Sequence, residues 1–243
     1  MTRQRSNGIA SRRTADTQYF FNRLTLFNGS GAAPAVWCHG YTGNYTSTGF
    51  SGFYGLAERG VPLTGGNNGG STLFGNDAAM AAVDAEIDAA LAYFGFDPEE
   101  PIVLVGGSMG SFTALAYAMK NPERVSVVCA YLPIVDLRQI VDPQPGQVDP
   151  TSAIPGAAAL ILANHGGSID SEDNPAENTT LIQSNDIPTR LYRSTNDTVG
   201  DPGLAEDFAN SCTNVELVDY GAQGHTTTGL DTEGMCDWVL SVI

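Results

Sequence analysis

The sequence is poor in positive charge and contains a single lysine, Lys120. Its 243 residues include 11 Lys and Arg against 27 Asp and Glu, which gives a formal net charge of −16 at pH 7. Because an acidic surface repels phosphate backbones, we expect no nucleic-acid partner. The same charge disfavours anionic membrane surfaces and highly anionic substrates.

Long apolar runs are also missing. No stretch approaches the roughly eighteen consecutive apolar residues that a membrane-spanning helix needs, so we expect no membrane partner. The pair Arg12-Arg13 is not followed by an apolar core before Tyr19, and we therefore predict no signal peptide. We expect residues 1–17 to form a polar N-terminal arm that is either disordered or docked on a neighbouring subunit.

Cysteine is scarce, and its pattern predicts no metal site. None of the 4 cysteines has the spacing of metal ligands. Cys38 and Cys129 lie in strand-like apolar runs, where a free thiol behaves as a small hydrophobic group. Cys212 and Cys236 lie near the ends of two late helical segments, and whether they pair stays open at this stage.

What the chain does have is enough apolar content, 42 %, for one large core over residues 18–243. Alternation and apolar runs predict strands at 19–27, 33–38, 61–63, 101–105, 124–131, 188–193 and 215–220. Helical spacing predicts helices at 53–59, 78–94, 111–120, 204–210 and 230–242, the second capped by Asn76-Asp77.

This order of elements predicts an α/β fold with a mostly parallel central sheet and helices on both faces. Regular patterning fades over residues 136–186, where Pro, Gly, Asp and Asn accumulate. We interpret 136–186 as a cap or insertion after the strand at 124–131. The loop 65–70 is rich in glycine but lacks the Lys-Ser/Thr ending of a phosphate-binding loop, so we interpret it as a connector.

The segment Gly106-Gly107-Ser108-Met109-Gly110 lies between a buried strand and a helix, which is the nucleophile-elbow pattern. The serine of such an elbow sits on a sharp turn, and its neighbours must be small to avoid the strand and helix. The helix N-terminus directs backbone N–H groups toward developing negative charge. Ser108 is therefore our candidate nucleophile. Its position also excludes a dinucleotide-binding turn, which needs glycine there.

A serine nucleophile needs a base, and the chain has 3 histidines. His225 lies in a glycine-rich loop directly after the last predicted strand, from which the imidazole can swing toward Ser108. His39 ends an early strand, where we expect a structural role. His165 lies in the predicted cap, where we expect a surface position or a substrate contact.

The base in turn needs a carboxylate, which in this order of elements comes between nucleophile and base. Asp197 follows the strand at 188–193 and is the favoured candidate. Asp201 is a nearby competitor, and Asp136, just after the strand at 124–131, is a third.

An oxyanion needs two fixed N–H donors. Met109 follows the nucleophile directly, and Tyr41 follows the strand end at His39-Gly40, so we expect their backbone N–H groups to form the oxyanion hole. The phenol of Tyr41 either lines the acyl site or only packs.

Together, the motifs resemble the α/β-hydrolase superfamily of serine esterases over residues 33–243. The run from Asn76-Asp77 through a helix to the elbow is similar to esterase-like hydrolases encoded by actinobacterial phages. The pairing of Gly40-Tyr41-Thr42 with Ser108-Met109-Gly110 also resembles cutinase-like polyester hydrolases. The sequence departs from that second group at Gly107, where His or Trp is usual, and at Ser111, where Gly is usual.

The resemblance implies hydrolysis of a small or polymeric carboxylic ester through an acyl-serine intermediate, with no metal or organic cofactor. The alternatives are a phage virion or tail component that uses the scaffold for binding, and the same three groups acting on thioester, amide or carbon–carbon bonds. A cytoplasmic or virion-associated location is expected, and assembly into a homo-oligomer or a virion stays open.

Overall fold

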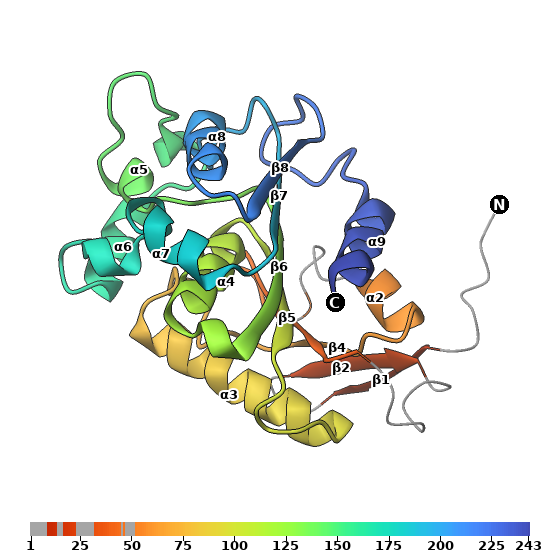
Figure 1. Ribbon diagram of the computed structural model, residues 1–243. Coiled ribbons are helices and arrows are strands. Elements are labelled where there is room, and N and C mark those ends of the chain that lie inside the picture. Colours follow the sequence, from red (N-terminus) through yellow and green to blue (C-terminus); the bar gives the residue numbers. More distant parts are fainter. Residues whose placement is uncertain (1–8, 14–16, 23–31, 45, 47–51) are drawn as a thin grey trace.

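The computed structural model describes residues 9–13, 17–22, 32–44, 46 and 52–243. Within these ranges the chain builds one sheet with helices on both faces (Figure 1). The strands are β1 Ile9–Arg13, β2 Gln18–Asn22, β3 Ala35–Cys38, β4 Leu63–Gly65, β5 Ile102–Gly107, β6 Val125–Tyr131, β7 Thr189–Arg193 and β8 Val215–Asp219.

The sheet is mostly parallel, as the sequence predicts. Its strand order is β1-β2-β4-β3-β5-β6-β7-β8. The ladder from β4 to β8 is parallel throughout, and only the β1–β2 and β2–β4 pairs are antiparallel. The carboxyl ends of β3, β5, β6, β7 and β8 therefore meet along one edge, where a site built on their following loops is expected.

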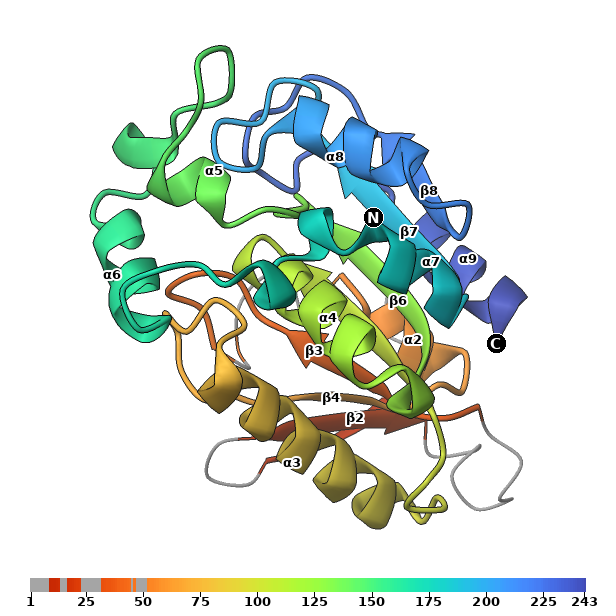
Figure 2. The same ribbon diagram turned by 60° about the vertical axis from the view of Figure 1, so that its left-hand side comes forward.

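The helices cover the sheet in two groups. They are α2 Tyr54–Glu58, α3 Asp77–Phe94, α4 Met109–Lys120, α5 Arg138–Val141, α6 Ala157–Asn164, α7 Thr179–Asn185, α8 Pro202–Asn210 and α9 Thr232–Val242. Figure 2 shows α3 and α4 in front of the sheet with α2 and α9 behind it. In the described part of the chain, no helix has both the length and the apolar character required to cross a membrane.

The core follows the alternation of side chains along the central strand. Ile102 and Leu104 of β5 join the apolar cluster under α3 and α4, whereas Val103 and Val105 join the cluster under α2 and α9. Every residue of β5 is buried. A strand buried on both faces is continuously apolar, and this is why the run at 101–105 is recognisable from sequence.

Helix α3 begins and ends where its capping residues require. The Asn76 side chain accepts a hydrogen bond from the Ala79 N–H at 3.0 Å, and Gly95 ends the helix in the left-handed region at φ 78°. Its buried face includes Met80, Val83, Ile87 and Leu91, which are the residues that the helical spacing predicts.

The N-terminal part of the sheet differs from the sequence-based expectation. Ile9–Arg13, which we expected in a polar arm, forms β1 and pairs antiparallel with β2. An edge strand is held by backbone hydrogen bonds, and a polar run does not reveal them in the sequence. The rest of the expected arm, 1–8 and 14–16, and the end of the expected strand at 19–27 lie outside the described residues.

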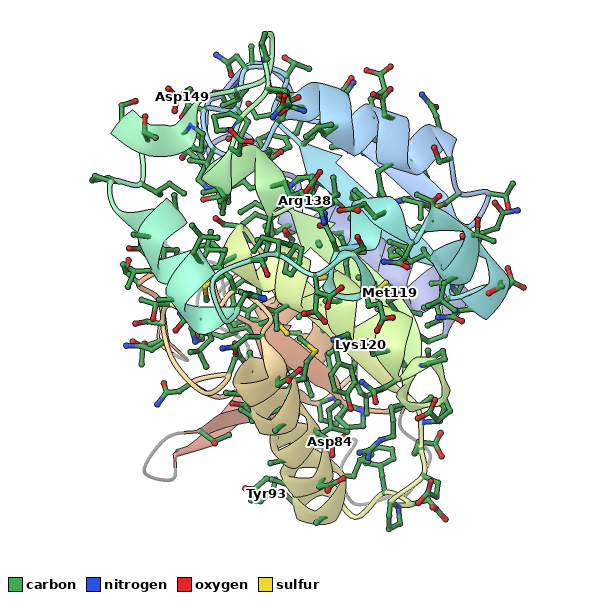
Figure 3. All side chains as sticks on the ribbon, turned by 90° about the vertical axis from the view of Figure 1, so that its left-hand side faces the viewer. Asp84, Tyr93, Met119, Lys120, Arg138 and Asp149 are labelled. Atoms are coloured by element: carbon green, nitrogen blue, oxygen red, sulfur yellow. The ribbon has the colours of Figure 1, made fainter. Side chains whose placement is uncertain are left out.

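Residues 136–186 fold as short helices beside α4. Four isoleucines of the segment (Ile140, Ile161, Ile169 and Ile182) join the core cluster under α3 and α4. Asp173 of the segment forms an ion pair with Lys120, the last residue of α4. Lys120 is labelled in Figure 3. The segment therefore extends the α4 side of the core, a placement that short helices without clear periodicity do not predict.

The four cysteines are free, buried thiols. Cys212 belongs to the core cluster under α3 and α4, and Cys236 belongs to the cluster under α2 and α9. The sheet separates the two, so the pairing that the sequence left open does not occur.

Candidate active site

Ser108 lies on a strained turn between β5 and α4. Its backbone has φ 55° and ψ −123°, a left-handed conformation that is costly for a non-glycine residue. The flanking positions have no room for a side chain. A Cβ at Gly110 would overlap the Cys38 backbone carbonyl, and a Cβ at Gly106 would overlap the Gly110 carbonyl. The five-residue elbow predicted from sequence is therefore present as a sharp strand-to-helix turn.

The Ser111 side chain stabilises the turn through hydrogen bonds to the backbone. Its hydroxyl donates to the Ser108 carbonyl at 2.6 Å and accepts from the Ile134 N–H at 2.9 Å. The Ser111 N–H also donates to the Ser108 carbonyl, at 2.8 Å. In the sequence, this position is recognisable only as a departure from the cutinase-like pattern. Its serine is a buried brace for the elbow.

Ser108, His225 and Asp197 form one hydrogen-bonded line. The Ser108 Oγ lies 2.8 Å from His225 Nε2, and His225 Nδ1 lies 2.7 Å from Asp197 Oδ1. A carboxylate only accepts hydrogen bonds, so Nδ1 carries the proton and Nε2 accepts from the serine hydroxyl. The three residues come from the loops after β7 and β8 and the turn after β5, which the parallel ladder brings to the same edge.

Asp197 is held in place by the backbone around it. Its side chain is buried, and Oδ1 also accepts from the N–H groups of Val199 at 2.7 Å and Gly200 at 3.1 Å. The loop therefore fixes the position of the carboxylate that contacts His225.

The two other carboxylates considered from sequence are used elsewhere. Asp201 caps α8 through the Gly203 and Leu204 N–H groups and also accepts from the Val148 N–H. Asp136 accepts from the Asn174 amide at 2.7 Å. Of the three candidates, only Asp197 contacts His225 within the described ranges.

The rings of the remaining histidines have hydrogen-bond partners other than Ser108. His39 is buried, with Nε2 2.7 Å from the Asn67 carbonyl, in the structural setting that the sequence predicts. His165 was expected at the surface or in contact with substrate. Its side chain is instead 2 % exposed and lies 3.1 Å from the Phe74 carbonyl, because residues 136–186 pack inward at this point.

Tyr41 follows β3 and Met109 follows β5, and because these strands are parallel neighbours both residues lie at the same edge of the sheet. Met109 is the first residue of α4, where N–H groups have no acceptor within the helix. No side chain or carbonyl of the described chain accepts a hydrogen bond from the backbone N–H of Tyr41 or of Met109. The Ser108 N–H, in contrast, donates to the Tyr131 backbone carbonyl. The Tyr41 ring packs on Phe74 at 5.4 Å between centroids, and Tyr41 also lines the cavity beside Ser108, so the two roles considered for its phenol coexist.

A cavity of about 320 Å³ opens beside Ser108. Its walls come from the ends of β3, β5 and β6 and from the loop after β8, and include Trp37, Tyr41, Tyr131, Leu132 and Thr226. No residue of 136–186 lines it. Ser108 and Leu132, which line the cavity, and Thr42, the neighbour of Tyr41, are three of the six non-glycine residues with positive φ in the described part of the chain.

Hydrogen bonds connect the loop that carries His225 to the loop that carries Asp197. The Asn196 side chain accepts from the Gly224 N–H at 2.6 Å, and the Ser194 hydroxyl accepts from the Gln223 N–H at 2.9 Å. The Tyr220 hydroxyl donates to the Thr226 carbonyl at 2.7 Å, on the other side of His225. We did not predict these hydrogen bonds, although the polar run Ser194-Thr195-Asn196 just before Asp197 was a signal for them.

Solved structures with the same fold are found over nearly the whole chain. Est1E from Butyrivibrio proteoclasticus is 16% identical over 97% of this chain and 98% of that chain, with a TM-score of 0.67. An S-formylglutathione hydrolase from Agrobacterium tumefaciens is 17% identical over 96% and 93%, with a TM-score of 0.64. Carboxyl esterase 2 from the fungus Tuber melanosporum is 11% identical over 96% and 85%, with a TM-score of 0.69.

Family models agree with these structures. No curated protein matches the sequence. A model of the α/β-hydrolase fold matches residues 29–130, and a model described as "Putative esterase" matches residues 87–230, more than half of the chain. The chain has the α/β-hydrolase fold and belongs to this esterase family.

Proposed function

We propose that this chain hydrolyses carboxylic esters through an acyl-serine intermediate, with Ser108, His225 and Asp197 as the catalytic triad. The observation that carries the proposal is the unbroken hydrogen-bonded line from Asp197 through His225 to Ser108, which ends at the open cavity. A serine hydroxyl becomes a useful nucleophile only with such a base at hydrogen-bond distance and with an acid that orients the base.

In the first half of the reaction, Ser108 Oγ attacks the ester carbonyl carbon while His225 Nε2 takes the hydroxyl proton. The carbonyl oxygen becomes an oxyanion that the Tyr41 and Met109 N–H groups bind. The tetrahedral intermediate then breaks its bond to the alcohol oxygen, which receives the proton from His225. The alcohol leaves, and the acyl group remains on Ser108.

In the second half, water attacks the acyl-serine and gives its proton to His225. A second oxyanion forms in the same N–H pair and collapses with release of Ser108 Oγ, which recovers the proton from His225. The products are one carboxylic acid and one alcohol. Asp197 orients His225 and stabilises the imidazolium that forms in both halves. Every step uses groups of the chain, so the proposal includes no cofactor.

Replacement of the nucleophile tests this directly. Ser108→Ala is expected to lower kcat for short p-nitrophenyl esters by roughly 10⁴-fold or more while the fold is kept, since the oxyanion donors remain. Ser184→Ala, which removes an exposed serine hydroxyl bonded only to the Leu181 carbonyl, is the matched control and is expected to keep wild-type rates. Wild-type turnover in Ser108→Ala would refute the proposal.

The alternatives predicted from sequence give different results in the same assay. A phage virion or tail protein that uses the fold only for binding would hydrolyse none of the esters at a Ser108-dependent rate. An enzyme for thioesters would show a higher kcat/KM on a thioester than on the oxygen ester with the same acyl group. We favour the ester because the matched family is an esterase family.

A further inference from the structure

Tyr131, the last residue of β6, presents the end of a buried phenol to the cavity beside Ser108. The residue is 6% exposed, and its ring stacks on Trp37 at 5.9 Å and on Phe53 at 6.3 Å between centroids. These neighbours fix the direction of the ring. Its oxygen therefore occupies a defined place in the wall of the cavity.

That place depends on Gly107, the residue before Ser108. Gly107 and Tyr131 are paired across β5 and β6. A Cβ at position 107 would lie 2.6 Å from the Tyr131 oxygen and 2.7 Å from a carbon of its ring, so any larger residue would push the phenol away. The absence of a side chain at Gly107 therefore leaves the space that the Tyr131 phenol occupies.

The Tyr131 hydroxyl has no hydrogen-bond partner in the described part of the chain. The unpaired hydroxyl is not sealed from solvent, and Tyr131 lines the cavity, so the hydroxyl faces the cavity. A phenol oxygen taken out of water costs free energy unless a partner replaces the lost hydrogen bonds. Burial raises the pKa of Tyr131 above its usual range, so the group stays a neutral O–H donor at working pH.

We propose that the Tyr131 hydroxyl hydrogen-bonds a polar group of the substrate, and that the preferred substrates are esters with a hydroxyl or similar group within a few atoms of the scissile carbonyl. This inference rests on the proposed function, because it assumes that the ester binds at Ser108. A purely apolar ester would leave the phenol unpaired when it displaced water from the cavity. If the ring were there only for packing, phenylalanine would serve equally well.

Pairs of esters with a methyl group in place of a hydroxyl group test the idea. On the acyl side, p-nitrophenyl 3-hydroxypropanoate is compared with p-nitrophenyl butyrate. On the alcohol side, 2-hydroxyethyl acetate is compared with propyl acetate. The wild-type chain is expected to favour the hydroxylated ester in at least one pair by roughly tenfold in kcat/KM, the worth of one good hydrogen bond.

Tyr131→Phe keeps the stacked ring and is expected to abolish that preference, because kcat/KM falls more on the hydroxylated ester than on the alkyl ester of the same pair. Tyr192→Phe is the matched control, since Tyr192 is 5% exposed in the same core cluster but does not line the cavity. It is expected to keep the preference. A ratio that both variants lower equally would show a structural effect and overturn the proposal.

The proposal is also overturned if the wild type shows no preference in either pair, or if Tyr131→Phe retains it. Running Ser108→Ala beside these variants separates the two hypotheses. Ser108-dependent hydrolysis without a preference rejects only the role of Tyr131. Hydrolysis that persists in Ser108→Ala rejects the proposed function itself.

Discussion

His225 Nδ1 lies 2.7 Å from Asp197 Oδ1 and 2.9 Å from Oδ2, although 28 residues separate the two in the chain. They meet because β7 and β8 are parallel neighbours, so the loops that follow these strands leave the sheet at the same edge. Both carboxylate oxygens face one ring nitrogen. This contact sets the tautomer of the imidazole and leaves Nε2 to accept the hydrogen bond from the Ser108 hydroxyl.

Asp197→Asn is expected to lower kcat by roughly 10³–10⁴-fold, because an amide can donate to Nδ1 and so favours the wrong tautomer. Asp201→Asn is the control, since an asparagine still caps α8. Steady-state kinetics on p-nitrophenyl butyrate distinguish them. Equal kcat values in the two variants would contradict the assignment of the acid.

Asn196→Ala is expected to lower kcat by roughly tenfold with little change in KM, because the Gly224 N–H loses its acceptor and the loop that carries His225 loosens. Asn196→Asp keeps an acceptor oxygen and should recover most of the rate. Kinetics at several pH values provide the measurement. If the alanine and aspartate variants were equally slow, the hydrogen bond to Gly224 would not be the cause.

Gly110→Ala is expected to destabilise the fold by at least about 2 kcal/mol, since the new Cβ would overlap the Cys38 backbone carbonyl in the sheet. For a chain of this size that corresponds to a melting temperature roughly 4–8 °C lower. Calorimetry on Gly110→Ala and Ser108→Ala checks it, the latter keeping the wild-type melting temperature. A wild-type value for Gly110→Ala would show that the elbow has more room than its geometry implies.

Glu86 of α3 is expected to make stability depend on pH. Burial raises the pKa of this carboxyl to about 7, against the lowering effect of hydrogen bonds from Asn68 and Gly66. The folded state then keeps a proton that the unfolded state releases above about pH 4.5, so stability falls as pH rises from there to about 7. At about 1.4 kcal/mol per pKa unit, the loss is at most about 3.5 kcal/mol.

Glu86→Gln removes this titration. Melting temperatures of the two proteins measured from pH 5 to pH 8 are expected to show a smaller decline for the variant. The comparison isolates Glu86, because all other titrating groups are shared. The same decline in both proteins would mean that Glu86 titrates in the folded state as it does in the unfolded chain.

The central strands and the three residues of the line were predictable because each leaves a local signal. Val103 and Val105 sit in a continuously apolar run, and Ser108 sits between flanking glycines that the turn requires. His225 and Asp197 follow strands, and in a parallel sheet position in the chain fixes which edge a loop reaches. Backbone geometry can thus be predicted from the sequence where only one residue type, such as glycine, allows it.

Other parts of the site depend on contacts between distant segments, which the sequence does not display. The Asn196–Gly224 hydrogen bond and the fit of Tyr131 over Gly107 arise only when neighbouring strands are aligned. The inward position of His165 follows from the packing of residues 136–186, whose helices are too short for clear periodicity. Strand β1 was missed because backbone pairing holds it.

Labelling with a fluorophosphonate tests whether Ser108 is an activated nucleophile, because such a reagent bonds covalently only to an activated serine. Mass spectrometry of the labelled, digested protein locates the adduct. We expect one adduct per chain, on Ser108, in the wild type and in Ser184→Ala, and we expect its loss in His225→Ala. An unlabelled wild type, or an adduct on another residue, would mean that Ser108 is not the activated nucleophile.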